Sequence, residues 1–160
     1  MFFKLSWKTN WRNSKVIGSV LAIAIALSLS VGTTSNAKST VMNREEIVAM
    51  VHRQASAWEN GDVAAIVADF ADDALFIAAR KEFQGKEAIQ KAAEDYFEQF
   101  TNTKVKIIRI IVEGSSGAVQ WNWSDQSRLT QNSSYAEDAI IFELKNDTIV
   151  YWREYIEKVT

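Results

Sequence analysis

Between residues 43 and 100 of the chain, apolar residues recur mainly at steps of three and four residues. Between Asn43 and Asn60 this spacing, together with an asparagine cap and acids in NREE, predicts an amphipathic helix. Gly61 ends that helix, and Asp62 can cap a second, shorter one that carries Ile66 and Phe70. We therefore expect two consecutive helices before the first strand.

A short strand is expected at LFIAA, residues 75–79, with Asp72 and Asp73 ending the second helix and starting the turn before it. The segment FQGKEAIQKAAEDYFEQF, residues 83–100, predicts a turn that leads into a third helix. The side chains on its apolar face are Ile89, Ala93, Tyr96, Phe97 and Phe100. The expected order in this half is helix, helix, strand, helix.

The pattern then changes to four β-rich runs, at residues 104–114, 117–129, 133–145 and 147–157. Clusters of Gly, Ser, Asn and Asp separate them, which is typical of an antiparallel meander, and KND indicates a tight last hairpin. Helices followed by consecutive strands predict an α+β fold, in which a strongly curved, mainly antiparallel sheet wraps around three helices.

Two acids interrupt the apolar faces of the last two runs. Because side chains alternate along a strand, Asp138 shares a face with Ala136, Ile140, Phe142 and Leu144. Glu154 likewise shares a face with Val150, Trp152 and Ile156. Burying an unpaired charge costs several kcal/mol. Either this face is open, or the acids are held there for a reason.

The first 37 residues have the pattern of a secretory signal peptide. Four basic residues precede an apolar run from Val16 to Val31, and Ser35 and Ala37 are suitably small for cleavage after Ala37. This predicts one mature domain at 38–160, exported to a periplasm or the extracellular space, without stable membrane association after cleavage. The alternative is an uncleaved membrane anchor, although the run is shorter than the ~20 residues that a spanning helix needs.

Composition excludes several classes of function. The chain has no cysteine and no proline, so disulfides, thiolate metal sites and cysteine nucleophiles are excluded. Residues 38–160 carry 14 basic and 20 acidic residues, which argues against nucleic-acid binding. The single histidine, His52, is expected to face solvent, and with scattered acids it forms no transition-metal site. We expect no metal and no cofactor.

Three segments carry a resemblance to a known family: AWENGDVAAIVADFADDALF, FQGKEAI and AIIFELKNDTIVYWREYIE. They are similar to the SnoaL-like branch of the nuclear transport factor 2 superfamily, which includes ketosteroid isomerases, polyketide cyclases and limonene epoxide hydrolases. The resemblance implies a cone-shaped α+β fold with a pocket between sheet and helices, and a homodimer formed through the outer face of the sheet. The fold is widely reused for unrelated chemistry, so it does not define an activity.

Side-chain parity also places a pocket on the inner face, lined for a small hydrophobic or ring-bearing molecule. The residues expected to line it are Gln54, Trp58, Phe76, Phe83, Tyr96, Trp121, Trp123, Ile140, Phe142 and Trp152. The alternative is that these aromatic residues fill a solid core.

The catalytic sets known in the family are incomplete in this chain. Aligned on the family motifs, Gln54, Ala78 and Ile140 occupy the positions where ketosteroid isomerases have a tyrosine, a base and a second aspartate. Of the catalytic residues of limonene epoxide hydrolases, only one acid has a counterpart in this chain, and that counterpart is Glu154. Polyketide cyclases resemble the chain more loosely, with an inward acid on the strand of Asp138.

Two hypotheses follow. The first is a non-catalytic domain that binds a small hydrophobic molecule in the aromatic pocket. The second is a cofactor-free isomerase, cyclase or hydrolase that uses Glu154, with Asp138, as general acid and base. A structural role remains open for both acids: Glu154 pairing with Arg109, Arg128 or a backbone donor, and Asp138 lying near solvent at a strand start.

Overall fold

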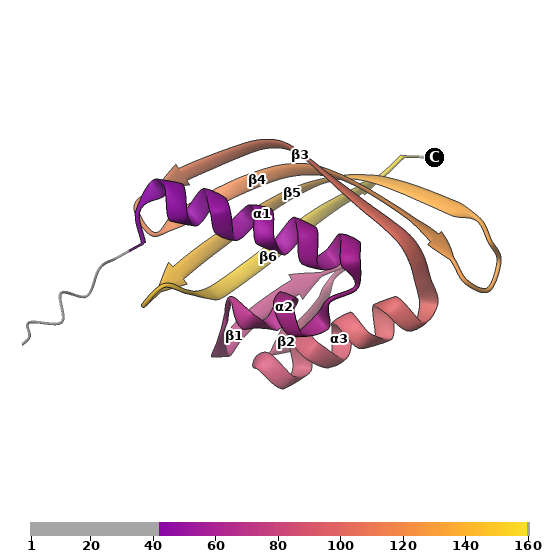
Figure 1. Ribbon diagram of the computed structural model, residues 1–160, viewed down its shortest axis with the longest axis horizontal. Coiled ribbons are helices and arrows are strands. Elements are labelled where there is room, and N and C mark those ends of the chain that lie inside the picture. Colours follow the sequence, from indigo (N-terminus) through magenta and orange to yellow (C-terminus); the bar gives the residue numbers. More distant parts are fainter. Residues whose placement is uncertain (1–41, 160) are drawn as a thin grey trace, which may run out of the picture. The chain divides into compact units, whose positions relative to one another are not determined.

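The computed structural model describes residues 42–159 and contains three helices and six strands (Figure 1). In chain order these are α1 (Arg44–Asn60), α2 (Val63–Ala68), β1 (Phe70–Ala78), β2 (Lys81–Gln84), α3 (Lys86–Gln99), β3 (Phe100–Glu113), β4 (Ser116–Ser127), β5 (Ser133–Lys145) and β6 (Thr148–Lys158). The predicted signal peptide and its cleavage site lie outside the described residues. Within residues 42–159, no helix is long and apolar enough to cross a membrane.

The helix ends follow the capping residues of the sequence. Asn43 and Glu46 form a capping box at the start of α1, and Gly61 ends the helix in the left-handed conformation at φ 66°. Asp62 accepts a hydrogen bond from the Ala65 N–H and so caps α2. The first two predicted helices are therefore confirmed, although α2 ends at Ala68, before Asp72 and Asp73.

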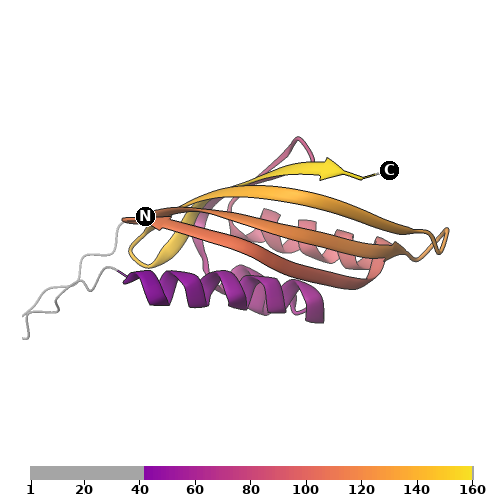
Figure 2. The same cartoon turned by 90° about the horizontal axis from the view of Figure 1, so that it is seen from above.

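The six strands form one mixed sheet in the order β2-β1-β6-β5-β4-β3. Strand β1 runs parallel to β6, and every other neighbouring pair is antiparallel. The sheet is long and curved but not closed, and α1 lies across the face that carries the inward side chains (Figures 1 and 2). The predicted α+β class, with three helices packed in a curved mixed sheet, is confirmed.

Strands β5 and β6 agree with the predicted alternation, with one local exception in β6. In β5, Ala136, Asp138, Ile140, Phe142 and Leu144 are all buried, as parity predicts. Glu143 of β5 pairs with Tyr151 of β6, but the next residue, Leu144, pairs with Ile149, so Val150 is left out of the pairing. As a result Ile149 is buried in place of Val150. The hairpin before β6 turns tightly at Asn146 and Asp147, which both have positive φ.

Two details of the first half of the fold differ from the prediction. Asp72 and Asp73 lie inside β1 rather than in a turn, because β1 starts at Phe70 and pairs with β6. Residues Lys81–Gln84 form β2 against the end of β1, so Phe83 and Gln84, expected to start the turn before the third helix, belong to a strand. Gln84 adds a side-chain hydrogen bond to the Asp73 carbonyl, which helps to hold this short edge strand.

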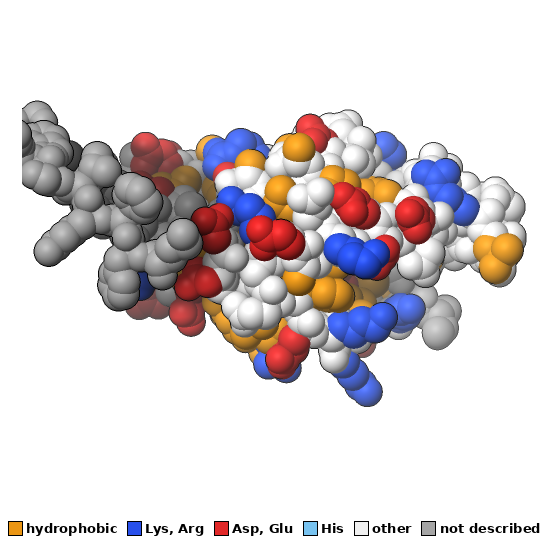
Figure 3. All heavy atoms as spheres, turned by 90° about the horizontal axis from the view of Figure 1, so that it is seen from below, with side chains coloured by type: hydrophobic (Ala, Val, Ile, Leu, Met, Phe, Trp, Pro, Cys, Tyr) orange, Lys and Arg blue, Asp and Glu red, His pale blue; other side chains and the backbone are white. Residues whose placement is uncertain are grey.

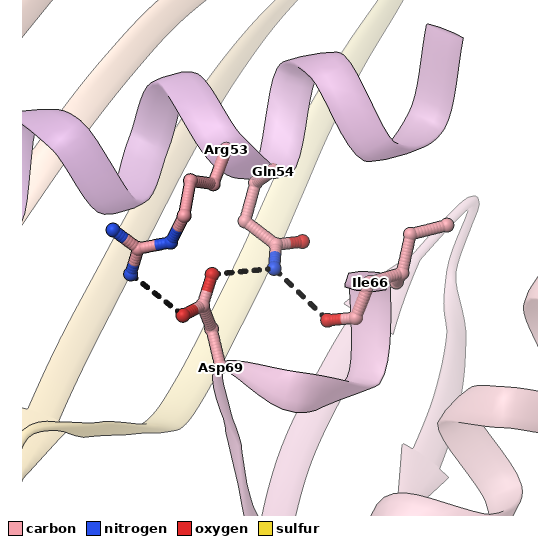
Figure 4. A network of polar contacts seen from close by, with 4 residues as sticks. All are labelled: Arg53, Gln54, Ile66 and Asp69. Carbon is pink, nitrogen blue, oxygen red and sulfur yellow. Dashed lines mark hydrogen bonds and ion pairs between the residues drawn. The ribbon is translucent and has the colours of Figure 1, made fainter. Parts of the chain in front are cut away.

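A polar network joins α1, α2 and the start of β1 (Figure 4). The Gln54 side-chain amide donates to the Ile66 carbonyl at 2.9 Å and to Asp69 Oδ2 at 3.1 Å. Arg53 pairs with the other oxygen of Asp69 at 2.7 Å. Because Gln54 is only 1% exposed, these bonds satisfy a buried amide and fix the angle between the two helices.

Candidate functional site

Glu154 lies on the inner face of β6 and is partly buried. Its Oε1 accepts a hydrogen bond of 3.0 Å from the indole Nε1 of Trp152, two residues earlier on the strand. Burial raises the pKa of Glu154 to about 8; the indole hydrogen bond lowers the pKa, and the charge of Asp138 raises it. At neutral pH this carboxyl group is therefore mostly protonated.

Asp138 lies on the neighbouring strand β5 and is only 4% exposed. Trp121, its direct partner on β4, donates its indole N–H to Asp138 Oδ2 at 3.2 Å. The second oxygen, Oδ1, is buried and has no hydrogen-bond partner. Burial raises the pKa of Asp138 to about 6, against the indole hydrogen bond that lowers it. The interpretation that solvent reaches Asp138 at a strand start is wrong.

The two carboxyl groups are diagonal neighbours on the sheet. Asp138 pairs with Ile156 and Ile140 pairs with Glu154, so the acids occupy adjacent rows of one face. Asp138, with the lower pKa, ionises first, and its charge then opposes ionisation of Glu154. Between the two pKa values, one member of the pair is an acid and the other a base.

No lysine or arginine among residues 42–159 forms an ion pair with either carboxyl group. Arg109, considered as a counter-ion for Glu154, is an exposed residue on the other face of the sheet. Arg128 instead donates to the backbone carbonyls of Phe97 and Phe100. The alternative in which Glu154 pairs with Arg109 or Arg128 is therefore wrong, and its hydrogen-bond donor is an indole N–H.

Both acids line one cavity of about 950 Å³, which we call the carboxyl cavity. It opens beside the part of β6 that follows Arg153, where the pairing with β1 has ended. Most of its lining residues, among them Arg109, Ile111, Gln120, Ala139, Arg153 and Tyr155, belong by register to the outer face of the sheet, whereas the side chains of Asp138 and Glu154 point to the inner face. The apolar and aromatic lining residues are Ile77, Ala79, Ile111, Ala118, Val119, Ala139, Tyr155 and Ile156.

None of the ten residues predicted to line a ligand pocket lines the carboxyl cavity. Seven of them are buried in the core: Gln54, Trp58, Phe76, Trp121, Ile140, Phe142 and Trp152. Phe83, Tyr96 and Trp123 are partly buried and pack against that core. This aromatic-rich interior is compatible with binding of a small apolar ligand, and the pocket between these particular side chains stays a prediction.

A second buried acid, Asp125, was missed by the sequence reasoning. Its Oδ2 accepts from the Tyr96 hydroxyl at 2.9 Å and from Trp123 Nε1 at 3.1 Å, and its Oδ1 accepts from Ser134. Thr103 also contacts the Tyr96 hydroxyl, and burial raises the pKa of Tyr96. The available signal was the spacing Trp123-x-Asp125, which repeats that of Trp152-x-Glu154.

Metal and nucleic-acid sites have little support in the described residues. Across residues 42–159, no three His, Cys, Asp or Glu side chains gather as metal ligands. His52 is exposed, as predicted. Acidic and basic side chains are interspersed on the face shown in Figure 3, which has no continuous basic surface of the kind that tracks a phosphate backbone.

The chain matches the model of the SnoaL-like domain over residues 51–152. This match spans most of the described fold, and the protein therefore belongs to the SnoaL-like family. No curated protein sequence matches the chain significantly.

Solved structures with the same fold are numerous, and three illustrate their range. An LEH-like epoxide hydrolase from M. tuberculosis is 18% identical, with a TM-score of 0.61 over 69% of this chain and 81% of that one. A ketosteroid isomerase-like protein from Erwinia carotovora atroseptica SCRI1043 is 14% identical, with a TM-score of 0.59 over 78% and 98% of the two chains. A protein of ketosteroid isomerase-like fold from Catenulispora acidiphila DSM 44928, solved with trimethylamine, is 18% identical, with a TM-score of 0.62 over 66% and 83%. Identities this low show a shared fold, not a shared activity.

Proposed function

We propose that this domain binds a small, partly apolar, ring-bearing molecule, and that Asp138 and Glu154 form the polar centre of the site. The observation that carries the proposal is that two carboxyl groups without a basic partner are diagonal neighbours on the inner face of the sheet, where each is bonded only to an indole N–H of the aromatic interior. A concave, mostly apolar cavity with a few converging polar groups is the usual form of a small-molecule site.

Proton transfer on the bound molecule is a second candidate function, favoured by the pKa values of the pair. With a pKa of about 8, Glu154 carries a proton to donate at neutral pH, while Asp138, with a pKa of about 6, is mostly ionised and can accept one. Such a pair suits a cofactor-free isomerisation, cyclisation or hydrolysis. In this role Glu154 is the general acid and Asp138 the general base.

The test of binding uses tryptophan fluorescence with a panel of ring-bearing compounds, together with mass spectrometry of molecules extracted from the purified protein. Glu154→Gln removes the ionisable group but keeps the shape of the side chain, and we expect it to change the affinity of compounds that bind. Glu143→Gln, on the neighbouring strand β5, exposed and outside the lining of the cavity, is the matched control. If no compound in the panel binds, the proposed function is wrong.

The test of proton transfer is turnover of isomerase, cyclase and epoxide substrates. A catalytic pair predicts a rate that peaks between about pH 6 and about pH 8 and that falls strongly in both Asp138→Asn and Glu154→Gln. If compounds bind but none is turned over, the domain is a binding module.

We also propose that the chain is exported after cleavage behind Ala37 and that it forms a homodimer through the outer face of the sheet. Exposed apolar side chains on that face, Ile111, Ile141 and Tyr155, support the dimer, because such side chains are commonly covered by a partner. Mass spectrometry of the secreted protein tests the first point, since the chain should begin at Lys38. Sedimentation of the purified protein and of Ile141→Lys tests the second, since the variant should be monomeric.

A further inference from the structure

We propose that two copies of this chain pack sheet to sheet about a two-fold axis parallel to the strands, so that Lys106 of each protomer pairs with the partner's Glu157. This inference rests on the homodimer put forward with the proposed function, and it adds the register and the charged contacts of that interface. It follows from the order of the charges across the outer face of the sheet.

One row of the outer face places like charges side by side. Glu137 of β5 lies directly opposite Glu157 of β6, and both side chains are exposed. Neither forms an ion pair among residues 42–159. Like charges at directly opposite positions destabilise a sheet. A cation brought by a partner would relieve this repulsion.

A suitable cation lies at the other end of the same row. From β6 to β3 the row consists of Glu157, Glu137, Asn122 and Lys106. Lys106 is exposed, and it also forms no ion pair in the described part of the chain. A two-fold axis parallel to the strands, between β4 and β5, sets each row against the same row of the partner in reverse order. Lys106 then lies over the partner's Glu157, and Asn122 lies over the partner's Glu137.

The two neighbouring rows fit the same arrangement. In the next row, Tyr155 of β6 lies opposite the partner's Arg109, which permits a cation–π contact. In the row after that, Ile141, which is 46% exposed, lies opposite the partner's Ala118, so a large apolar side chain packs over a small one. The outer face is thus complementary to itself, as a two-fold interface requires.

Other positions of the axis bring like charges together. An axis along β4 sets Glu143 against the partner's Glu113, and an axis along β5 sets Glu137 against its own copy. An axis across the strands sets Arg109 or Arg153 against its own copy when it passes through their rows, and Glu143 against the partner's Glu137 when it passes between them. Like charges that face each other across an interface oppose association. Face-to-face sheets also commonly pack with their strands nearly aligned.

The experiment measures dimer dissociation constants by sedimentation of Lys106→Glu, of Glu157→Lys and of an equimolar mixture of the two. Each variant alone has two like-charge contacts, so we expect its dimer to dissociate at least about tenfold more readily than that of the unmodified chain. A heterodimer in the mixture has one original contact and one with the charges exchanged, so it should regain most of the affinity. Glu98→Lys makes the same charge change on exposed surface of α3, and it should leave the dimer unchanged.

Weak dimers of the two variants, together with recovery in the mixture, would support the proposal. Unchanged dimers of both variants, or no recovery in the mixture, would overturn the proposed register and leave the homodimer standing. Recovery of Lys106→Glu by Glu137→Lys but not by Glu157→Lys would also overturn it. If the unmodified chain is monomeric, both this inference and the homodimer are wrong, and the binding of a small molecule is tested separately.

Discussion

The indole N–H of Trp152 donates to the carboxyl group of Glu154 across 3.0 Å, within a single strand. Trp123 and Asp125 form the same contact at the same spacing on β4, and Trp121 donates to Asp138 from the strand beside it. Residues two apart on a strand lie on one face, so an inward tryptophan can satisfy an inward acid without a basic partner. Each of these buried or partly buried acids on the inner face is thus held by a neutral donor, which keeps the site free of internal ion pairs.

The raised pKa of Glu154 predicts that its ionisation destabilises the fold. The folded pKa of about 8 lies above the ordinary value of 4.5, so the stabilisation is complete below about pH 4.5 and is lost as the pH rises through about 8. We expect Glu154→Gln to increase the free energy of unfolding by roughly 1–3 kcal/mol at about pH 9, and to give no increase at about pH 4. Urea unfolding across this range measures the effect.

The control for this measurement is Glu157→Gln, which removes an exposed carboxyl group from the same strand. Its effect should be small at every pH. If Glu154→Gln destabilises the protein at about pH 9, the carboxylate of Glu154 is stabilised by a contact that this geometry lacks.

Trp121→Phe removes the hydrogen bond to Asp138 while keeping an aromatic ring at the position. Both oxygens of Asp138 are then without a donor, so its pKa should rise above about 6. We expect the free energy of unfolding to fall by about 1–3 kcal/mol at about pH 8. In an Asp138→Asn background the same change should cost less, and a double-mutant cycle measures that coupling. Strictly additive effects would contradict the coupling.

Gln54 and Arg53 are adjacent on α1 but should contribute very differently to stability. Gln54 is buried and holds both Ile66 and Asp69, whereas the Arg53 side chain is 53% exposed in its ion pair. We expect Gln54→Leu to cost about 1–3 kcal/mol and Arg53→Met less than about 1 kcal/mol. Thermal unfolding of the two variants compares them directly, and equal losses would show that the network of Figure 4 acts as one unit.

The fold was predictable because local signals agreed with one another. The caps at Asn43, Gly61 and Asp62 predicted two helices, and the period of two predicted the inward faces of β4 and β5. The β-bulge at Val150 was not predictable, because Ile149 to Trp152 is a continuous run of apolar and aromatic residues, so that either Ile149 or Val150 could face inward. Strand β2 was missed because its four residues owe their state to pairing with β1.

The site was predictable in part. Parity placed Glu154 and Asp138 on one face, but it could not show which neutral donors would satisfy them or that Asp138 Oδ1 would have none. Those facts depend on side-chain rotamers and on register across three strands. Parity also could not distinguish tryptophans that line a pocket from tryptophans that fill the core, since both face inward.

Gly117 is required by close packing, which gives a last prediction. It lies directly opposite Phe142, and a Cβ at this position would clash with the Phe142 ring and lie 2.7 Å from the Ile111 carbonyl oxygen. Phe142 has no exposed surface and stacks on Trp152, with ring centroids 5.8 Å apart. We expect Gly117→Ala to reduce the free energy of unfolding by about 2–3 kcal/mol and to alter tryptophan fluorescence, because Phe142 must move against Trp152.

Gly114→Ala is the matched control for this change. Gly114 has a positive φ of 58°, but an added Cβ would meet no atom within 4 Å. That variant should cost only about 1 kcal/mol of backbone strain and leave the fluorescence unchanged. Equal losses in the two variants would mean that the Phe142 ring yields freely, and that the packing beneath Trp152 does not constrain the donor of Glu154.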